Sequence, residues 1–228
     1  MKFLERLKKS GFSTIISTSH YYEGYFEEDE ENRLKKIEKL NKVSDNLEIK
    51  VGSEIFCSPD IVKFLNEKKS STLAGSRYVL FEIPFTNNVS FFDMMIDSLR
   101  RNGFLPVIAH PERYDIVIDN PKIVEEWHKR GIYIQCNYES ITGKYGKESE
   151  EVIKLLLRHR LVDFLGSDVH RPGTYKRIKF SVEKIKKIID DDYFEVLSNR
   201  NEEKVLKNEK IEIEECEEIR KTIFGKYK

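Results

Sequence analysis

The stretch that indicates the fold is LPVIAHPER, residues 105–113, in which an apolar run stops at His110. Five further stretches repeat this design, each a β-branched or apolar run that stops at a residue able to bind a metal or to form hydrogen bonds. They are STIISTSH (13–20), LEIKVGSE (47–54), YVLFE (78–82), IYIQCN (132–137) and VDFLGSDVH (162–170). Because β-branched and aromatic residues favour strands, the pattern predicts six strands with polar residues at their carboxyl ends.

The segments between these runs are charge-rich, amphipathic and of helical length. They are residues 27–43, 58–69, 90–103, 120–131, 147–160 and 173–189. Strands that alternate with helices predict βα units around a parallel sheet. We therefore expect an α/β fold, and in a βα barrel the carboxyl ends of the strands meet at one mouth. Three histidines and three carboxylates would then lie together, which suggests a multinuclear metal site.

Apolar spacing indicates which helix faces are buried. In the helix expected at 27–43, Leu34, Ile37 and Leu40 are the apolar positions. The first residues, 1–12, read as a further amphipathic helix that leads directly into the first strand, and a βα barrel normally opens with a strand.

One domain over residues 1–228 is the simplest interpretation, since the length suits a single βα domain. Ser58 is a natural N-cap for the helix expected at 58–69, with Pro59 in its first turn. Residues after about 190 are expected to be packing helices and a polar tail without chemistry.

Composition excludes several classes of protein. Lys+Arg and Asp+Glu both total 40, so bulk charge does not favour nucleic acid. Three well-separated cysteines argue against a disulfide framework and for a reducing cytosol. The chain contains no apolar run of about 18 residues and no signal-peptide core, so we expect a cytoplasmic protein without membrane insertion.

Two motifs carry the strongest chemical signal. In SDVH, Asp168 and His170 are two residues apart at a strand end, and alternate strand residues share one face. In AHPER, His110 ends a strand and Arg113 is suited to pair with an anion such as phosphate. The structural alternatives stay open here: an Asx turn for Asp168, and loop carbonyls as partners of His110 or Arg113.

Three further candidates lie at the ends of the earlier strands. Glu54 follows Gly52, a residue that permits close backbone approach. Glu82 lies in a hydrophobic run, where an unpaired carboxylate is costly unless a cation is present. A lysine or arginine partner is the alternative for both glutamates, and a lone histidine such as His20 is more often structural.

Other chemistry-bearing residues are expected to be structural. His128 and His159 lie on charged helices and are expected at the surface, whereas Cys57 and Cys136 are expected in the core. No cysteine is followed by arginine six positions later, and phosphate-loop, dinucleotide and nucleophile-elbow motifs are absent from the sequence. The aromatic residues after His20 are either a substrate-contacting loop or, slightly favoured, a hydrophobic cap; they are Tyr21, Tyr22, Tyr25 and Phe26.

As a set, these stretches resemble the bacterial protein-tyrosine phosphatases of the polymerase-and-histidinol-phosphatase (PHP) superfamily, the type encoded with capsule and exopolysaccharide genes. The resemblance covers nearly the whole chain, in order. Its stretches are TIISTSHYYEGYFE, VGSEIF, TLAGSRYVLFEIPF, GFLPVIAHPERY, ITGKYGK and LGSDVH.

The resemblance implies a distorted βα barrel of the TIM-like, PHP type. It also implies a multinuclear metal centre, usually supplied with Mn, although Fe, Zn or Co would suit the same ligands. It implies that metal-activated water attacks phosphotyrosine, with a bacterial tyrosine kinase that controls polysaccharide export as the expected substrate. Matching positions make His20, Glu54, Glu82, His110, Asp168 and His170 the expected ligands, with Glu54 as the bridging carboxylate. By the same match, Arg113 is the expected phosphate clamp, and Arg113, Asp168 and His170 are the expected catalytic residues.

One departure from the family pattern is serious. Family members open with a strand that carries an H-x-H pair, followed by an aspartate, and this sequence has neither. We therefore expect the first strand and its ligands to be missing. Two alternatives to a protein-tyrosine phosphatase stay open. One is another phosphoesterase of the superfamily, such as a histidinol-phosphate phosphatase. The other, which the absent H-x-H pair favours, is an inactive module that binds phosphotyrosine.

Overall fold

The computed structural model describes residues 11–44, 46–86, 89–169, 175–213, 216, 218–221 and 227. The helix expected at 1–12 falls almost wholly outside the described residues, and His170 lies outside them too. The chain divides into two compact units. The first comprises the described residues of 11–83, 89–106 and 205–208, and the second those of 84–86, 107–204 and 209–227. The prediction of one domain over 1–228 stays a prediction.

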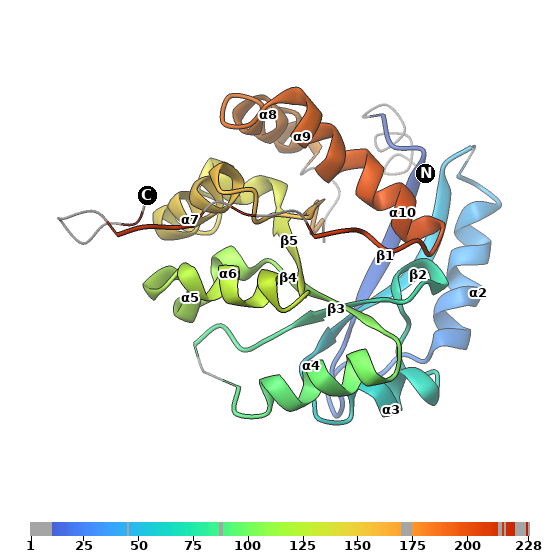
Figure 1. Cartoon of the computed structure of the whole chain (residues 1–228). Coiled ribbons are helices and arrows are strands. Elements are labelled where there is room, and N and C mark those ends of the chain that lie inside the picture. The colour runs from blue at the N-terminus through green and yellow to red at the C-terminus, as the bar shows by residue number, and fades with distance from the viewer. Residues whose placement is uncertain are drawn as a thin grey trace. The chain divides into compact units, whose positions relative to one another are not determined.

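The first unit is a parallel βα arrangement, as the sequence predicts. Its strands are hydrogen-bonded in the order β1 (Thr14–Tyr21), β2 (Glu48–Phe56) and β3 (Tyr78–Glu82). Its helices are α2 (Glu30–Asn41), α3 (Ile61–Asn66) and α4 (Phe92–Arg101), and a 3₁₀ turn (Leu73–Gly75) precedes β3. Helix α2 runs alongside β2, and α3 lies beside α4 (Figure 1).

The buried face of α2 differs from the one expected from its apolar residues. Ile37 is buried, but Leu34 and Leu40 are 47% and 41% exposed, and the second buried side chain is Arg33. The guanidinium of Arg33 donates to the carbonyl oxygen of Lys69 at 3.1 Å and to the Ser71 hydroxyl at 3.2 Å. Arginine takes the inner position because its donors satisfy buried oxygens that a leucine would leave unpaired.

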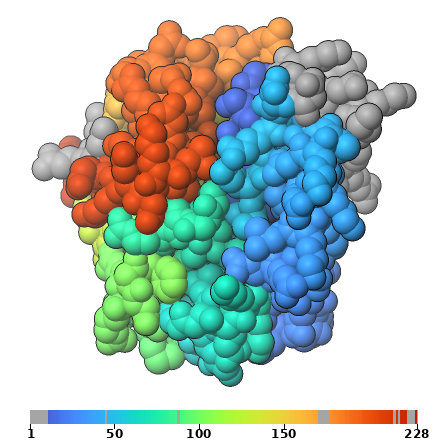
Figure 2. Space-filling view, turned by 90° about the vertical axis from the view of Figure 1, so that its right-hand side faces the viewer, coloured from blue at the N-terminus to red at the C-terminus, as the bar shows by residue number. Residues whose placement is uncertain are grey.

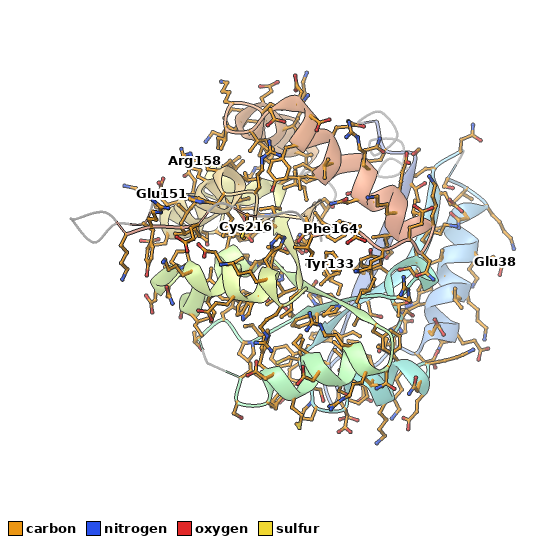
Figure 3. The ribbon with its side chains drawn as sticks, viewed as in Figure 1. Glu38, Tyr133, Glu151, Arg158, Phe164 and Cys216 are labelled. Carbon is orange, nitrogen blue, oxygen red and sulfur yellow. The ribbon has the colours of Figure 1, made fainter. Side chains whose placement is uncertain are left out.

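The start of α3 also differs from the prediction. Ser58 caps the preceding turn, because its hydroxyl accepts from the backbone N–H of Asp60 at 3.1 Å, and the helix itself begins at Ile61. Glu38 lies on the outer surface of α2 and faces solvent (Figure 3). Helix α2 belongs to the blue part of the chain on the right-hand side of Figure 2.

The second unit repeats the parallel pairing with residues 107–109 of β4 (Leu105–Ala109), followed by β5 (Tyr133–Asn137) and β6 (Phe164–Gly166). The predicted helices are present as α6 (Lys122–Lys129), α7 (Lys147–Arg158) and α8 (Tyr175–Ile185). Helix α5 (Asp115–Asp119) and two 3₁₀ turns, Pro111–Arg113 and Tyr138–Thr142, were not expected. Tyr133 and Phe164 come from neighbouring strands, with ring centroids 6.3 Å apart (Figure 3).

After residue 190 the chain forms α9 (Asp191–Glu195), a π-helical turn (Val196–Arg200) and α10 (Asn201–Leu206). Leu197 is fully buried, and the Tyr193 hydroxyl donates to the carbonyl oxygen of Val162 at 2.8 Å. None of the described helices is long and apolar enough to cross a membrane.

The prediction for the two helix histidines is wrong. His128 is 2% exposed and His159 is 9% exposed, so both are buried. The Nε2 atom of His128 lies 3.4 Å from Oδ1 of Asp163, a residue whose carboxylate also accepts from the N–H of Ile134. The sequence of a charged helix does not reveal that His128 faces inward. An imidazole can be buried there because it lies beside the Asp163 carboxylate.

The cysteine prediction is confirmed for Cys57 and Cys136, which are free thiols buried in the core. Burial, with a contribution from the nearby Glu82 carboxylate, raises the pKa of Cys57 to about 12. Burial and the charge of Glu112 raise the pKa of Cys136 as well. Both thiols therefore lack the thiolate character that nucleophilic cysteines need.

Gly52 is required by close packing between β1 and β2. A Cβ atom at this position would lie 2.8 Å from Cγ2 of Ile16 and 3.2 Å from Cγ2 of Thr18. Gly52→Ala should therefore lower the free energy of unfolding by about 1–3 kcal/mol, the usual cost of overpacking. Urea unfolding measures this loss. The double variant Gly52→Ala/Ile16→Ala should show strong coupling, and purely additive effects would contradict the packing explanation.

Glu202, in the first turn of α10, gives a second prediction. Burial raises its pKa from 4.5 to about 8, so between these pH values the folded chain keeps a proton that the unfolded chain has lost. Below about pH 4.5 the carboxyl is protonated in both states, so it does not affect the free energy of unfolding. As pH rises from there towards 8, Glu202 lowers the free energy of unfolding. Glu202→Gln should abolish this loss, so that the variant is more stable than the parent at pH 8.5 and similar at pH 4.5.

Thermal unfolding across this pH range measures the difference. Glu203→Gln is the matched control, because Glu203 is on the exposed side of the same helix. Equal pH profiles for the parent chain and Glu202→Gln would show that this carboxyl does not titrate as stated.

Candidate functional site

In the first unit, three of the predicted metal ligands come together at the ends of three strands. Nδ1 of His20 lies 3.4 Å from Oε1 of Glu82 and 3.7 Å from Oε2 of Glu54. The ligand atoms of the three residues all lie within 4.8 Å of one another. We call these residues the His20 cluster.

Strand register accounts for this convergence. His20 on β1 is the direct partner of Glu54 on β2, and Glu82 on β3 is the partner of Phe56, two residues after Glu54. The side chain of Glu54 is 7% exposed and that of Glu82 is 16% exposed, whereas that of His20 is 35% exposed. The cluster is therefore reached by solvent from the histidine side.

The donor set fits a divalent transition metal. One imidazole nitrogen and two carboxylate oxygens are ligands that Zn, Mn and Fe accept, and their spacing lets one ion contact all three. A protonated His20 that bridges the two carboxylates would be a purely structural alternative. Metal binding distinguishes the two, because the structural pair needs no ion.

In the second unit, Asp168 is the centre of a hydrogen-bond network. Its Oδ2 atom accepts from Nη1 of Arg113 at 3.1 Å, from Nδ2 of Asn137 at 3.0 Å and from the hydroxyl of Tyr145 at 3.4 Å. We call Asp168 and these three donors the Asp168 cluster. Burial is the main cause that raises the pKa of Tyr145, so its hydroxyl stays protonated and donates.

A side chain of the same strand, β5, orients the amide of Asn137. Gln135 Nε2 donates to Oδ1 of Asn137 at 3.0 Å, which leaves the Nδ2 group to face Asp168. A Cβ at residue 166 would lie 2.3 Å from that Gln135 nitrogen, so Gly166 makes room for it. The carboxylate of Glu112, which is fully buried, accepts from the backbone N–H of Asn137 at 2.9 Å and from the Ser140 hydroxyl at 2.6 Å.

Arg113 is held between two aromatic rings. Its guanidinium carbon lies 4.8 Å from the ring centroid of Phe85 and 4.2 Å from that of Tyr145. This double cation–π contact, with the Asp168 bond, fixes the plane of the guanidinium. A guanidinium has five N–H donors, so its other edge can still bind an anion in a bidentate manner.

His110 begins the turn that carries Arg113. It has a left-handed backbone (φ 37°), and its side chain is 3% exposed between Phe85 and Tyr114, where the sequence suggested an imidazole that projects from the strand end. Asp168 also has a left-handed backbone (φ 43°). Such conformations are uncommon for residues other than glycine and concentrate at functional sites.

Sequence reasoning missed several residues of the Asp168 cluster and its support. The sequence marks Asn137 only as a strand end, and Tyr145 only as part of the ITGKYGK stretch. Gln135, Ser140 and Phe85 have no signal of their own, because their roles depend on the folded positions of their neighbours.

A separate cavity of about 240 Å³ lies beside His128 and Asp163, before the amino end of β6. Its arginines are paired, Arg160 with Asp190 at 2.6 Å and Arg200 with Asp192 at 2.7 Å. Asp168 lies past the carboxyl end of the same strand, so the cavity is not part of the Asp168 cluster.

Comparison with known proteins identifies the family. The family model described as "Capsular polysaccharide synthesis, CpsB/CapC" matches residues 1–207. The chain is 34% identical over 171 residues to tyrosine-protein phosphatase CpsB of Streptococcus pneumoniae, an alignment that covers 71% of this chain and 70% of that protein. It is 27% identical over 225 residues to the putative tyrosine-protein phosphatase CapC of Staphylococcus aureus, which covers 92% and 84% of the two chains.

The fold is also that of a solved structure. With a TM-score of 0.84 and 23% identity, the structure superposes on one from a study of YwqE from Bacillus subtilis and CpsB from Streptococcus pneumoniae, described as unique metal-dependent tyrosine phosphatases. The superposition covers 96% of this chain and 90% of the other, which confirms the predicted fold class. Given the match over residues 1–207 and the 34% identity to CpsB, this chain belongs to the CpsB/CapC family of capsular polysaccharide synthesis proteins.

Proposed function

We propose that this chain is a metal-dependent protein-tyrosine phosphatase that hydrolyses phosphotyrosine on a protein. The observation that carries the proposal is the His20 cluster, an imidazole and two carboxylates spaced for a divalent ion. Membership of a family whose relatives are named tyrosine-protein phosphatases supports the substrate class. The finer proposals are that the metal is Mn, that the protein is cytoplasmic, and that the substrate is the C-terminal tail of a bacterial tyrosine kinase.

The reaction transfers a phosphoryl group from tyrosine to water. The bond between phosphorus and the phenolic oxygen breaks, and a bond between phosphorus and the water oxygen forms. The phenolic oxygen gains a proton from that water. A metal bound to the ligand cluster would supply Lewis acidity, which lowers the pKa of water and offsets charge on the phosphoryl oxygens.

Each described cluster has one part in the proposal. His20, Glu54 and Glu82 hold metal, and the resemblance adds His110, Asp168 and His170 to the ligands. Arg113 binds the phosphoryl oxygens with the guanidinium edge that does not face Asp168, and Phe85 and Tyr145 keep that edge oriented. Asn137 and Tyr145 hold Asp168 in place through its Oδ2 atom.

The test of the proposal is phosphate release from a phosphotyrosine peptide by the chain with Mn²⁺, beside phosphoserine peptide and histidinol phosphate. We expect turnover of phosphotyrosine above both other substrates, and its loss with a chelator. Preference for histidinol phosphate would favour the other phosphoesterase class. Tight binding of the phosphotyrosine peptide without turnover would favour a binding module.

Metal binding gives a prediction that does not depend on activity. Glu82→Gln and His20→Ala each remove a donor from the His20 cluster, so Mn²⁺ affinity should fall by at least about tenfold, a typical minimum for loss of groups that hold a metal. Equilibrium dialysis or electron paramagnetic resonance of Mn²⁺ measures it. Glu48→Gln is the matched control, since Glu48 is exposed at the opposite end of β2. Unchanged affinity in both variants would make the cluster structural.

Arg113 separates phosphate binding from metal binding. Arg113→Ala should leave Mn²⁺ affinity unchanged and lower kcat/KM for the phosphotyrosine peptide by about a hundredfold, since it removes a charged donor from the transition state. Arg113→Lys should recover only part of this loss, because lysine keeps the charge without the planar fork. The clamp assignment is wrong if Arg113→Ala turns the peptide over at the parental rate.

A further inference from the structure

Three aromatic side chains form an exposed group directly after β1. Tyr22 is 37% exposed, Tyr25 is 74% exposed and Phe26 is 60% exposed. We call these three residues the aromatic rim. Large aromatic side chains gathered at the surface are a frequent mark of a binding surface.

The aromatic rim is preorganised. Tyr22 and Phe26 form an antiparallel bridge, with Tyr22 N–H donating to the Phe26 carbonyl at 3.0 Å and Phe26 N–H donating to the Tyr22 carbonyl at 2.8 Å. Gly24 provides the left-handed residue (φ 82°) that this tight turn requires. The ring of Tyr22 is stacked between Tyr25, at 4.6 Å, and Phe56, at 4.2 Å. The stack therefore ends in the exposed ring of Tyr25, which a further ring can extend.

A covering role explains only one member of the aromatic run. Tyr21 is 2% exposed and packs on Phe64, with ring centroids 5.2 Å apart, so it does cover the core. Tyr25 and Phe26 leave most of their surface in solvent and cover little. The hydrophobic-cap interpretation therefore accounts for Tyr21, whereas it does not account for the exposed surface of Tyr25 and Phe26.

The aromatic rim adjoins the His20 cluster. Phe26 has its ring centroid 6.2 Å from that of His20, and the stack rests on Phe56, two residues after Glu54 on the same strand. Both groups lie at the carboxyl ends of β1 and β2. A polypeptide whose phosphorylated side chain reached the His20 cluster would thus pass the aromatic rim with its neighbouring residues.

The chain segment that carries the aromatic rim is acidic. Residues 23–31 contain six acidic residues and no basic one. Two of these are balanced, Glu28 by Lys36 and Glu31 by Lys35. Among the described residues, neither Glu23 nor Glu27 is in an ion pair, although the Glu27 carboxylate accepts from the N–H of Gly24. An occupant with basic residues is favoured here over an acidic one.

We propose that the aromatic rim binds the stretch of substrate polypeptide beside the phosphotyrosine, and that it selects an aromatic residue accompanied by a lysine or arginine. The substrate's aromatic ring stacks on Tyr25, and its basic residue faces Glu23. This proposal rests on the proposed phosphatase function, and it adds the features of the protein substrate that the chain recognises beyond the phosphate.

The experiment compares two substrates with and without flanking residues. With Mn²⁺ present, kcat and KM are measured for a phosphotyrosine peptide that has Phe and Lys beside the phosphotyrosine, and for p-nitrophenyl phosphate, which has no flanks. Tyr25→Ala should raise KM for the peptide by about three- to tenfold, the value of one aromatic pair, and leave p-nitrophenyl phosphate unchanged. Tyr25 stacks only on Tyr22 among the described residues, so the fold should persist.

Two further variants make the test specific. Phe180→Ala, at a 52% exposed phenylalanine on α8, is the matched control and should change neither substrate. Glu23→Lys should reverse the preference between a peptide with a Lys flank and one with a Glu flank. Equal effects of Tyr25→Ala on both substrates, or no effect on either, would overturn the proposal.

Failure of the proposed function has a different signature. If the chain hydrolyses no phosphotyrosine substrate, fluorescence polarisation of the unphosphorylated peptides still tests the aromatic rim. Tighter binding of the Phe/Lys peptide than of a Gly/Glu peptide, lost in Tyr25→Ala, would keep the docking proposal without the phosphatase. Equal binding of the two peptides would refute it.

Discussion

The parallel register between β1 and β2 is the constraint on which the first unit depends. It sets His20 opposite Glu54, and a shift by one residue would turn one of the two side chains to the other face of the sheet. Gly52 supports this register, because its missing Cβ leaves room for Ile16 and Thr18 of the neighbouring strand. The same strand ends then carry Tyr22 and Phe56, so the metal-binding geometry and the exposed aromatic stack both result from one pairing.

In the second unit, hydrogen bonds fix the position of the Asp168 side chain, because the strand before it is too short for its register to do so. Strand β6 has only three residues, so its pairing alone does little to fix the position of Asp168. Three donors from three different segments hold Oδ2 of Asp168, and its left-handed backbone is maintained against its intrinsic cost. Each donor is itself held: Arg113 by two rings, and Asn137 by Gln135 and by the carboxylate of Glu112.

The strands were predictable because alternation and β-branching are local signals, whereas the supports of the site are not. His110, Asp168 and the two glutamates were found from their positions at strand ends, which any parallel sheet gathers on one edge. Gln135 and Ser140 were not found, because nothing in their local sequence indicates which side chain they will meet. Arg33 and His128 are buried although polar residues on amphipathic helices usually face solvent, because Arg33 donates to the oxygens of Lys69 and Ser71 and His128 lies beside the Asp163 carboxylate. His159 is buried as well.

The charges of the His20 cluster, together with its spacing, make it a candidate metal site. Glu54 and Glu82 bring two negative charges to within reach of one imidazole, in surroundings where Glu54 is almost fully removed from solvent. Like charges held this close are costly in a low-dielectric environment, and a cation placed between them would lower that cost. A divalent ion would at the same time take the imidazole nitrogen as a third ligand. The spacing that the three strands impose therefore suits a divalent ion.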